Sequence, residues 1–363
     1  MIVQSRLYPF NEIVDEMNYK SHLREAIRFL KNKGLGETTR YKVPGSSLSV
    51  ELKNVQTLNG EIESGFSNLA DGSIITLFDK TPFPENGPDV VCPHFVELKW
   101  ANGCNFDCAW CYLNGTLRFR PCGKKPYLKD ENKILNHIRN FLNQYNKPCI
   151  LNSGELSDSL VFEYNGQAIS KKIIPLFKKQ TNHKLLILTK SSDIKKLIKT
   201  EAQENIIVSF SLNAFEVAKR WEKGAPKPKN RIKAAKRLSD DGYKIRIRID
   251  PIIPVENWDT GYKELIDHLF NNLTPERITI GSLRGLQSTI NNSKDTSWVK
   301  YLDDRSNWGK KISFDKRFEM YRTIINYLHE KYNYSEIGLC KETVEMWNKL
   351  EMDYKKIGCN CIF

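Results

Sequence analysis

The sequence predicts an α/β protein built around a partial (β/α)6 barrel, with a small N-terminal α+β domain before it and a cysteine-bearing extension after it. Six short apolar runs rich in β-branched residues have the pattern of buried parallel strands. Helical patterns lie between them, and parallel strands require such crossovers. The polar and cysteine motifs fall at strand ends, where barrels of this kind carry their chemistry. The predicted strands are His94–Trp100, Cys149–Asn152, Leu185–Thr189, Ile206–Ser211, Ile245–Ile249 and Ile278–Ser282.

The region before the barrel has a different pattern. We expect a basic amphipathic helix near Ser21–Lys33, then short alternating segments at Ser47–Leu52 and Ser73–Phe78. The Pro-rich stretch Thr81–Pro93 has the composition of a linker. The expected regions are 1–90 for the N-terminal domain, 91–285 for the barrel and 286–363 for the extension.

Helical periodicity fills the spaces between the predicted strands. Asp130 is a candidate N-cap for the first of these helices. A long helix around Phe314–His329 is expected in the extension. The helices between strands are Asp130–Tyr145, Ala168–Lys179, Asp193–Lys199, Asn230–Asp241 and Asp259–Asn271.

Composition excludes several classes of protein. The 363 residues are 40% hydrophobic and 27% charged, with a mean hydropathy of −0.51, and no apolar run approaches the ~18–20 residues of a membrane helix. The N-terminal segment has no apolar signal region, so we expect a cytoplasmic protein that does not associate with a membrane. The net charge of +13 is favourable for nucleic acid, although lysines on solvated helix faces, such as Lys171-Lys172 and Lys195-Lys196, are an alternative reason for it.

Three of the nine cysteines stand in a C-x3-C-x2-C run directly after the first predicted strand. The thiolates of Cys104, Cys108 and Cys111 suit three irons of a cubane cluster and leave the fourth iron open. The alternative is a zinc site, which favours four ligands in two short pairs. No fourth Cys or His lies at an obvious spacing, so the sequence favours a cluster.

This loop, with an aromatic residue before its last cysteine, is identified as the signature of radical S-adenosylmethionine (SAM) enzymes. From about Phe95 to Leu283 the sequence resembles the spore photoproduct lyase family, whose members reverse a thymine dimer in spore DNA. Several motifs keep the order and spacing of that family. They are Gly103-Cys through Cys111-Tyr-Leu113, Leu188-Thr-Lys190, Ser209-Phe-Ser-Leu-Asn-Ala214, Asn230-Arg-Ile-Lys-Ala-Ala235, Asp240-Gly-Tyr243, Asp250-Pro-Ile252 and Trp258 through Gly-Tyr262.

The resemblance implies a [4Fe–4S] cluster, SAM as cofactor and a set of SAM contacts. Lys190, Ser211 and Asn213 are expected to hydrogen-bond the SAM carboxylate and ribose, and a Lys cation suits a carboxylate. Ordinary strand-end capping is the alternative for these three. Trp110 is expected to pack near the SAM adenine. Glu155, in Asn152-Ser-Gly-Glu155, is expected to accept from the SAM ammonium, with an exposed loop carboxylate as the alternative.

One catalytic feature of the family is absent from the matching loop. Tyr112 matches a tyrosine that relays a hydrogen atom in the lyases, unless it only packs. The lyases also place a hydrogen-donating cysteine in a Ser-Cys-Thr-Ser-Asp run, where this chain has Ser153-Gly-Glu-Leu-Ser-Asp158. Cys149 lies earlier, inside the strand. We therefore expect SAM cleavage but a net outcome other than dimer reversal.

A second group of cysteines lies near the C-terminus. Cys340, Cys359 and Cys361 can supply three thiolates to an auxiliary Fe–S cluster, with Cys92, Cys122 or substrate as the fourth ligand. Inert thiols are the alternative reading of this group.

Three functions remain open from the sequence. The first is a radical SAM enzyme acting on a nucleic-acid or nucleotide-type substrate. The second is a radical SAM enzyme that modifies a peptide or protein, and the third is a non-catalytic Fe–S sensor or binding protein. Either enzyme requires a reductant such as flavodoxin or ferredoxin as a partner, and the sequence assigns no oligomeric state.

Overall fold

The computed structural model describes residues 37–42, 48–56, 62–68, 74–78, 84–92, 95–145, 148–164, 168–306, 308–356 and 358–363. The amphipathic helix expected near Ser21–Lys33 lies outside these residues. Among the described helices, none is both long enough and apolar enough to cross a membrane.

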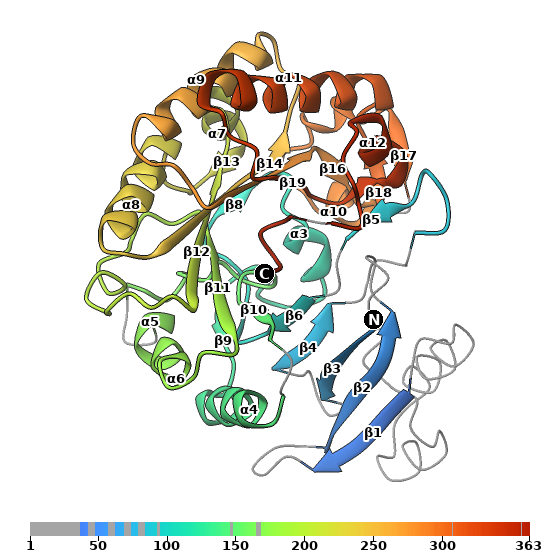
Figure 1. The fold of residues 1–363 in the computed structure, drawn as a ribbon. Helices are drawn as coiled ribbons and strands as arrows, with labels where there is room; N and C mark the ends of the chain where they lie inside the picture. Colours follow the sequence, from blue (N-terminus) through green and yellow to red (C-terminus); the bar gives the residue numbers. More distant parts are fainter. Residues whose placement is uncertain are drawn as a thin grey trace.

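An eleven-stranded sheet organises the structure into a mixed α/β fold (Figure 1). Seven of its strands pair in parallel, in the order β6-β10-β11-β12-β14-β15-β19. The six predicted strands all form, with small differences at their ends. The seventh, β19, was not predicted because three residues are too few to show a periodicity, and it adds part of the C-terminal extension to the sheet. The strands are β6 (Phe95–Leu98), β10 (Ile150–Asn152), β11 (Lys184–Thr189), β12 (Ile206–Leu212), β14 (Lys244–Ile252), β15 (Arg277–Ser282) and β19 (Ile337–Leu339).

Four antiparallel strands continue the sheet beyond β6. The last of them, β4, pairs with β6 through Ile75 opposite Leu98 and Phe78 opposite Phe95. Backbone hydrogen bonding thus runs across the boundary that the sequence predicted between an N-terminal domain and the barrel. These strands are β1 (Glu37–Lys42), β2 (Leu48–Gln56), β3 (Ile62–Asn68) and β4 (Ile75–Phe78).

The larger helices lie on the outer side of the parallel strands (Figure 1). The Asp130 carboxylate caps the first one, α4, by accepting from the Lys133 backbone N–H at 2.7 Å, as predicted. The helix expected at Ala168–Lys179 is split in two, because Pro175 has no N–H to continue it. The segment expected as a helix at Asp193–Lys199 forms only turns. The helices are α4 (Glu131–Gln144), α5 (Ile169–Lys172), α6 (Ile174–Phe177), α7 (Phe215–Trp221), α8 (Pro228–Asp240), α9 (Trp258–Phe270) and α11 (Phe314–Tyr332).

Short strands and helices form within the loops that join the larger elements. Antiparallel pairs form between β8 and β13, between β5 and β20, and between β7 and β9, while β16, β18 and β17 make a small sheet. These elements are β5 (Val90–Val91), β7 (Ala101–Asn102), β8 (Asp107–Cys108), α3 (Leu113–Thr116), β9 (Tyr127–Leu128), β13 (Glu222–Lys223), β16 (Arg284–Gly285), α10 (Gln287–Asn291), η1 (Val299–Tyr301), β17 (Asp304–Ser306), β18 (Gly309–Lys311), β20 (Glu342–Thr343) and α12 (Val344–Lys349).

The C-terminal tail lies inside the arc of strands (Figure 1). The buried Asn360 amide donates to Ser209 Oγ at 2.8 Å and to the Ile247 carbonyl at 2.9 Å, and its Oδ1 accepts from Thr279 Oγ1 at 2.9 Å. Because these partners belong to β12, β14 and β15, the tail is fixed across three neighbouring strands.

Candidate functional site

The three-cysteine loop begins at a glycine that no other residue replaces without strain. Gly103 has a φ of +90°, and a Cβ there would come within 2.6 Å of the Lys124 and Lys125 carbonyls. Its N–H donates to the Leu156 carbonyl at 2.8 Å, and the Cys104 N–H donates to the Lys124 carbonyl at 2.8 Å. The start of the loop is therefore held between two other segments.

Cys104, Cys108 and Cys111 line one cavity of about 340 Å³. Cys108 lies in β8 opposite Glu222 of β13, and the Cys111 N–H donates to the Cys108 carbonyl at 3.2 Å. Burial raises the pKa of Cys104 and raises that of Cys108 to about 12, so both stay protonated at neutral pH unless a cation stabilises the thiolates. A metal ion or cluster bound at these cysteines would supply that positive charge.

The number of thiols bears on which metal group fits. Among the described residues, no group of three or more His, Cys, Asp or Glu is arranged around a single metal ion. A structural zinc site uses four protein ligands. Three thiolates can hold three irons of a cubane cluster and leave the fourth iron open.

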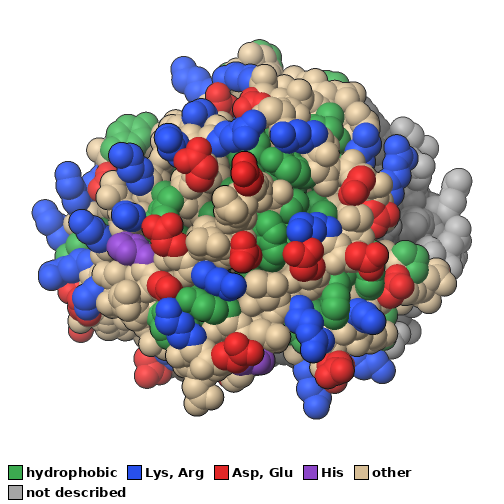
Figure 2. All heavy atoms as spheres, turned by 90° about the horizontal axis from the view of Figure 1, so that it is seen from above, with side chains coloured by type: hydrophobic (Ala, Val, Ile, Leu, Met, Phe, Trp, Pro, Cys, Tyr) green, Lys and Arg blue, Asp and Glu red, His purple; other side chains and the backbone are tan. Residues whose placement is uncertain are grey.

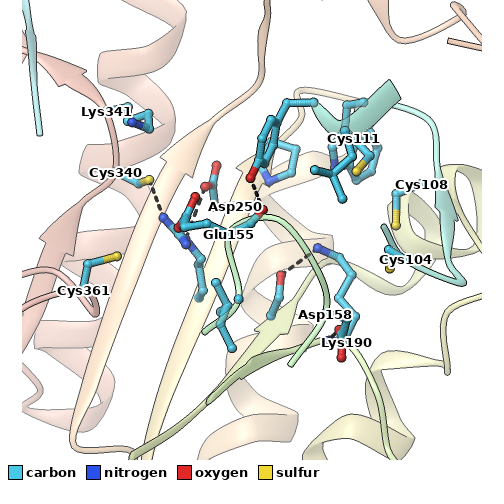
Figure 3. A pocket seen from close by; sticks show the side chains of 18 of the residues that line it. Cys104, Cys108, Cys111, Glu155, Asp158, Lys190, Asp250, Cys340, Lys341 and Cys361 are labelled. Carbon is cyan, nitrogen blue, oxygen red and sulfur yellow. Dashed lines mark hydrogen bonds and ion pairs between the residues drawn. The ribbon is translucent and has the colours of Figure 1, made fainter. Parts of the chain in front are cut away.

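Lys190 projects into the same cavity from the end of β11 (Figure 3). Its Nζ donates to Ser211 Oγ at 2.9 Å and lies 3.6 Å from Glu222 Oε1. Glu222 is also paired with Arg231, whose Nη2 is 2.6 Å from Glu222 Oε2, and both side chains are fully buried. Burial acts to lower the pKa of Lys190, but Glu222 and Cys108 raise it overall, so the cation persists beside the cysteines.

Asp158 fixes the backbone that carries Lys190. Its carboxylate accepts from Thr189 Oγ1 at 2.7 Å, from the Lys190 N–H at 2.7 Å and from the Leu160 N–H at 2.9 Å. From the sequence, Asp158 was recognised only as the last residue of the loop that differs from the family pattern. Its contacts show that this loop positions the strand end, even without the cysteine of the family pattern.

Glu155, Tyr112 and Trp110 also line the cavity. Glu155 Oε1 accepts from Asn152 Nδ2 at 3.0 Å, and the Tyr112 hydroxyl donates to the Glu155 backbone carbonyl. The Trp110 ring stands edge-on to Trp221, with centroids 6.0 Å apart. The structure therefore brings these three together with Lys190, as expected from their places at the ends of neighbouring strands.

Asn213 is placed differently from the expectation. It is completely buried and is not among the residues that line the cavity. Its amide donates to the Pro251 carbonyl at 2.8 Å, and its Oδ1 accepts from the Tyr262 hydroxyl at 2.7 Å and from the Ala214 N–H at 2.9 Å. These contacts occupy the side chain, so Asn213 supports the cavity wall and does not reach into it.

A group of charged residues that the sequence did not single out forms another wall of the cavity. Arg284 donates to both Asp250 oxygens, at 3.0 and 2.9 Å, and Arg248 Nε is 3.4 Å from Asp250 Oδ2. Burial acts to raise the pKa of Asp250, but the two guanidinium groups lower it to about 2. A signal was present in the sequence, because Arg246, Arg248 and Asp250 alternate along an otherwise apolar strand.

Cys340, Cys359 and Cys361 line the cavity too, and Figure 3 shows Cys340 and Cys361 across it from Cys104 and Cys108. The structure adds Cys92 to them, which packs in one buried cluster with Cys359 and Cys361. A single cavity thus joins the two cysteine groups that the sequence treated separately.

The two remaining cysteines lie elsewhere. Cys122 is exposed and accepts from Arg120 Nη2 at 3.2 Å. Cys149 Sγ lies 3.3 Å from His183 Nδ1. Neither is among the residues that line the cavity.

The sequence profile described as spore photoproduct lyase matches residues 94–289. The chain is 30% identical over 175 residues to a spore photoproduct lyase of Clostridium acetobutylicum and 26% identical over 175 residues to that of Bacillus subtilis. Each match covers 47% of this chain and 50% of the relative, so the chain spans about half the length of these two curated relatives. A Geobacillus spore photoproduct lyase is 25% identical over 257 residues, which cover 64% of this chain and 72% of the relative.

Solved structures agree on the fold. A spore photoproduct lyase complexed with dinucleoside spore photoproduct has a TM-score of 0.57 at 18% identity, covering 73% of this chain and 80% of that one. A lyase variant with bound AdoMet and dinucleoside spore photoproduct has a TM-score of 0.56 at 19% identity, covering 68% and 75%.

Proposed function

The chain belongs to the spore photoproduct lyase family, and from this membership we propose that it is a radical SAM enzyme. In this proposal Cys104, Cys108 and Cys111 hold a [4Fe–4S] cluster with one open iron. When bound and reduced, this cluster supplies the electron that cleaves SAM into methionine and a 5′-deoxyadenosyl radical. In this proposal the first six parallel strands and their outer helices act as the expected partial (β/α)6 barrel, and β19 extends it.

One observation carries the proposal. The three cysteines of the C-x3-C-x2-C loop share a cavity with Lys190, Ser211 and other polar side chains from neighbouring strand ends. A zinc-binding or structural loop has no need of a buried cation and an open cavity beside its thiols. A site for a cluster and an anionic, amino-acid-like cofactor needs both.

The polar residues of the cavity have distinct tasks in this proposal. Lys190 binds the SAM carboxylate, and Glu222 holds Lys190 in place. Ser211 orients the Lys190 ammonium and the ribose, and Glu155 accepts from the SAM ammonium. Trp110 packs against the adenine. Asn213 acts as a positioning residue, through the backbone of Pro251.

We propose a nucleic-acid or nucleotide-type substrate, because the relatives are named spore photoproduct lyases and one solved neighbour holds a dinucleoside photoproduct. Arg248, Arg284 and Lys341 line the cavity beside the single carboxylate of Asp250. This wall therefore has a net positive charge, which is favourable for a phosphate. Figure 2 shows that Lys and Arg on the displayed face are interspersed with Asp and Glu, so the support comes from the cavity rather than from a basic stripe. A DNA or RNA mobility shift that weakens with salt supports this class, and binding to peptides alone opposes it.

The net outcome proposed is a modification or crosslink rather than dimer reversal. The loop Gly154–Asp158 has no cysteine to quench a product radical. Tyr112 is the proposed relay residue, since its hydroxyl reaches the cavity-lining Glu155 segment. Cys340, Cys359 and Cys361 are proposed as ligands of an auxiliary Fe–S cluster, and a flavodoxin or ferredoxin as the reductant.

The test is SAM cleavage by anaerobically reconstituted, dithionite-reduced protein. Wild type is expected to form 5′-deoxyadenosine, and Cys108→Ala to form none, because two thiolates do not hold the cluster. Cys122→Ala, which removes an exposed cysteine outside the cavity, is the matched control and retains cleavage. Equal 5′-deoxyadenosine from Cys108→Ala and wild type would overturn the assignment.

A further inference from the structure

We infer that Cys92 completes a second site with Cys340, Cys359 and Cys361, and that this four-thiolate site takes an iron–sulfur cluster with no open iron. The inference deepens the proposed function and rests on it for iron–sulfur chemistry. It identifies Cys92 as the fourth ligand of the second cluster. With four thiolates, that cluster has no iron to which substrate could bind.

Two short strands bring Cys92 and Cys340 together. β5 pairs antiparallel with β20, with Val91 opposite Glu342 and Val90 opposite Thr343. Continuing this register places Cys92 opposite Lys341, next to Cys340. The Lys341 Nζ to Cys92 Sγ distance of 3.4 Å agrees with that register.

The tail brings the other two cysteines to the same place. A Cβ on Gly338 would lie 2.5 Å from the Gly358 carbonyl oxygen and 2.9 Å from the Cys359 nitrogen, so the tail passes directly against β19. Asn360 is anchored across β12, β14 and β15, and Cys359 and Cys361 on either side of it line the cavity. The anchor explains why two cysteines flank one asparagine.

Nitrogen donors surround these sulfurs. Arg248 Nη2 donates to Cys340 Sγ at 2.8 Å and Arg284 Nη2 donates to it at 3.5 Å. Lys341 donates to Cys92, and Asn152 Nδ2 donates to Cys361 Sγ at 3.7 Å. N–H donors and cations are what thiolate ligands of an anionic cluster require, and they tune its reduction potential.

Burial distinguishes Cys92 from Cys122 as the fourth ligand. All four cysteines are buried, whereas Cys122 is exposed and outside the cavity, which removes it as the fourth ligand. Four thiolates would leave no open iron, so an iron of this cluster would not ligate substrate.

The experiment uses the full chain with Cys104, Cys108 and Cys111 all changed to Ala, so that only the second site holds iron. After anaerobic reconstitution we expect about four irons per chain. Adding SAM is expected to leave the EPR signal of the reduced protein unchanged, because no iron is open. Cys92→Ala in this background leaves three thiolates and one open iron, so its EPR signal is expected to shift when a small ligand such as cyanide is added. Cys122→Ala leaves all four thiolates, so its signal is expected to stay unchanged. Cys92→Ser is expected to retain the cluster with an altered EPR spectrum, which covers the case in which the alanine variant fails to fold.

The outcomes separate this inference from the proposed function. A background variant without iron, when wild type still cleaves SAM, overturns the second cluster and leaves the proposed function intact. Zinc in place of iron, or a signal that SAM shifts, overturns the closed iron–sulfur assignment. EPR signals of the Cys92→Ala and Cys122→Ala proteins that both stay unchanged when cyanide is added overturn the role of Cys92. Loss of SAM cleavage in wild type, with iron retained in the background variant, counts against the proposed function alone.

Discussion

Glu222 is the residue whose loss tests the electrostatic support of the site. Its fully buried carboxylate lies between Arg231, at 2.6 Å, and Lys190, at 3.6 Å, and its backbone pairs with Cys108. Glu222→Gln keeps the shape of the side chain but removes the negative charge. Arg231 and Lys190 are then two buried cations without their carboxylate.

Breaking a buried ion pair by removing one partner costs about 3–5 kcal/mol, and we expect Glu222→Gln to lower the free energy of unfolding by that amount at pH 7. The cost depends on pH. Burial acts to raise the pKa of Glu222, but Arg231 and Lys190 lower it overall, below its ordinary value of 4.5. The carboxylate therefore stabilises the fold above about pH 4.5, and this stabilisation is lost as the pH falls through the folded-state pKa.

Urea unfolding followed by circular dichroism measures the effect, with Glu216→Gln as the matched control. Glu216 is paired with Lys219 at 3.6 Å on the exposed face of α7, with both side chains mostly in solvent. Exposed pairs contribute little, so the control is expected to cost under about 0.5 kcal/mol. If Glu222→Gln costs no more than Glu216→Gln, or if its cost grows as the pH falls below 4, the reasoning about this buried pair is wrong.

Three other outcomes follow from the same contacts. Lys190→Met is expected to weaken SAM binding by about 10- to 100-fold in equilibrium dialysis, because a charged hydrogen bond is lost. The control Lys195→Met changes an exposed lysine and is expected to leave the affinity unchanged. Equal affinities of the two variants for SAM would remove Lys190 from the SAM site. Gly338→Ala is expected to displace the C-terminal tail and lower the iron content of the reconstituted protein. Gly358→Ala, where a Cβ meets nothing within 4 Å, is expected to retain the full iron content. Full iron content in both variants would contradict the inferred role of the close contact at Gly338. With photoproduct-containing DNA, we expect few thymines restored per 5′-deoxyadenosine, because Gly154–Asp158 lacks the donor; efficient multiple-turnover repair would refute this and make Cys340 or Cys361, in the cavity, the first donors to mutate.

Local sequence patterns were sufficient to locate the parallel strands and to single out Cys104, Cys108 and Cys111 as a candidate group. The strands from β6 to β15 are short and mostly apolar, with charged residues alternating only along β14, and Cys104, Cys108 and Cys111 are close in sequence. Both features are therefore visible within short windows of sequence. The prediction of one continuous helix between β10 and β11 was wrong, because hydrophobic periodicity does not show that Pro175 lacks the N–H needed to continue it.

Contacts between distant segments were not predictable from one sequence. The Asp250–Arg284 pair, and the buried cluster that contains Cys92 and Cys361, join residues far apart along the chain. Nothing in the local pattern of residues 337–339 marks them as a strand, since β19 forms only by pairing with β15. Asn213 shows the same limit. Its motif predicted that it lies near the end of a strand, but not that its amide group is hydrogen-bonded to Tyr262 and Pro251.

The central claim is that Cys104, Cys108 and Cys111 hold a cluster with one iron open to SAM. EPR spectroscopy of the reduced protein, in a variant with Cys340, Cys359 and Cys361 changed to Ala, tests it without the second site. The account predicts a [4Fe–4S] signal that shifts when SAM is added, because SAM becomes a ligand of the open iron. A signal that SAM leaves unchanged, or no iron in this variant, would contradict it.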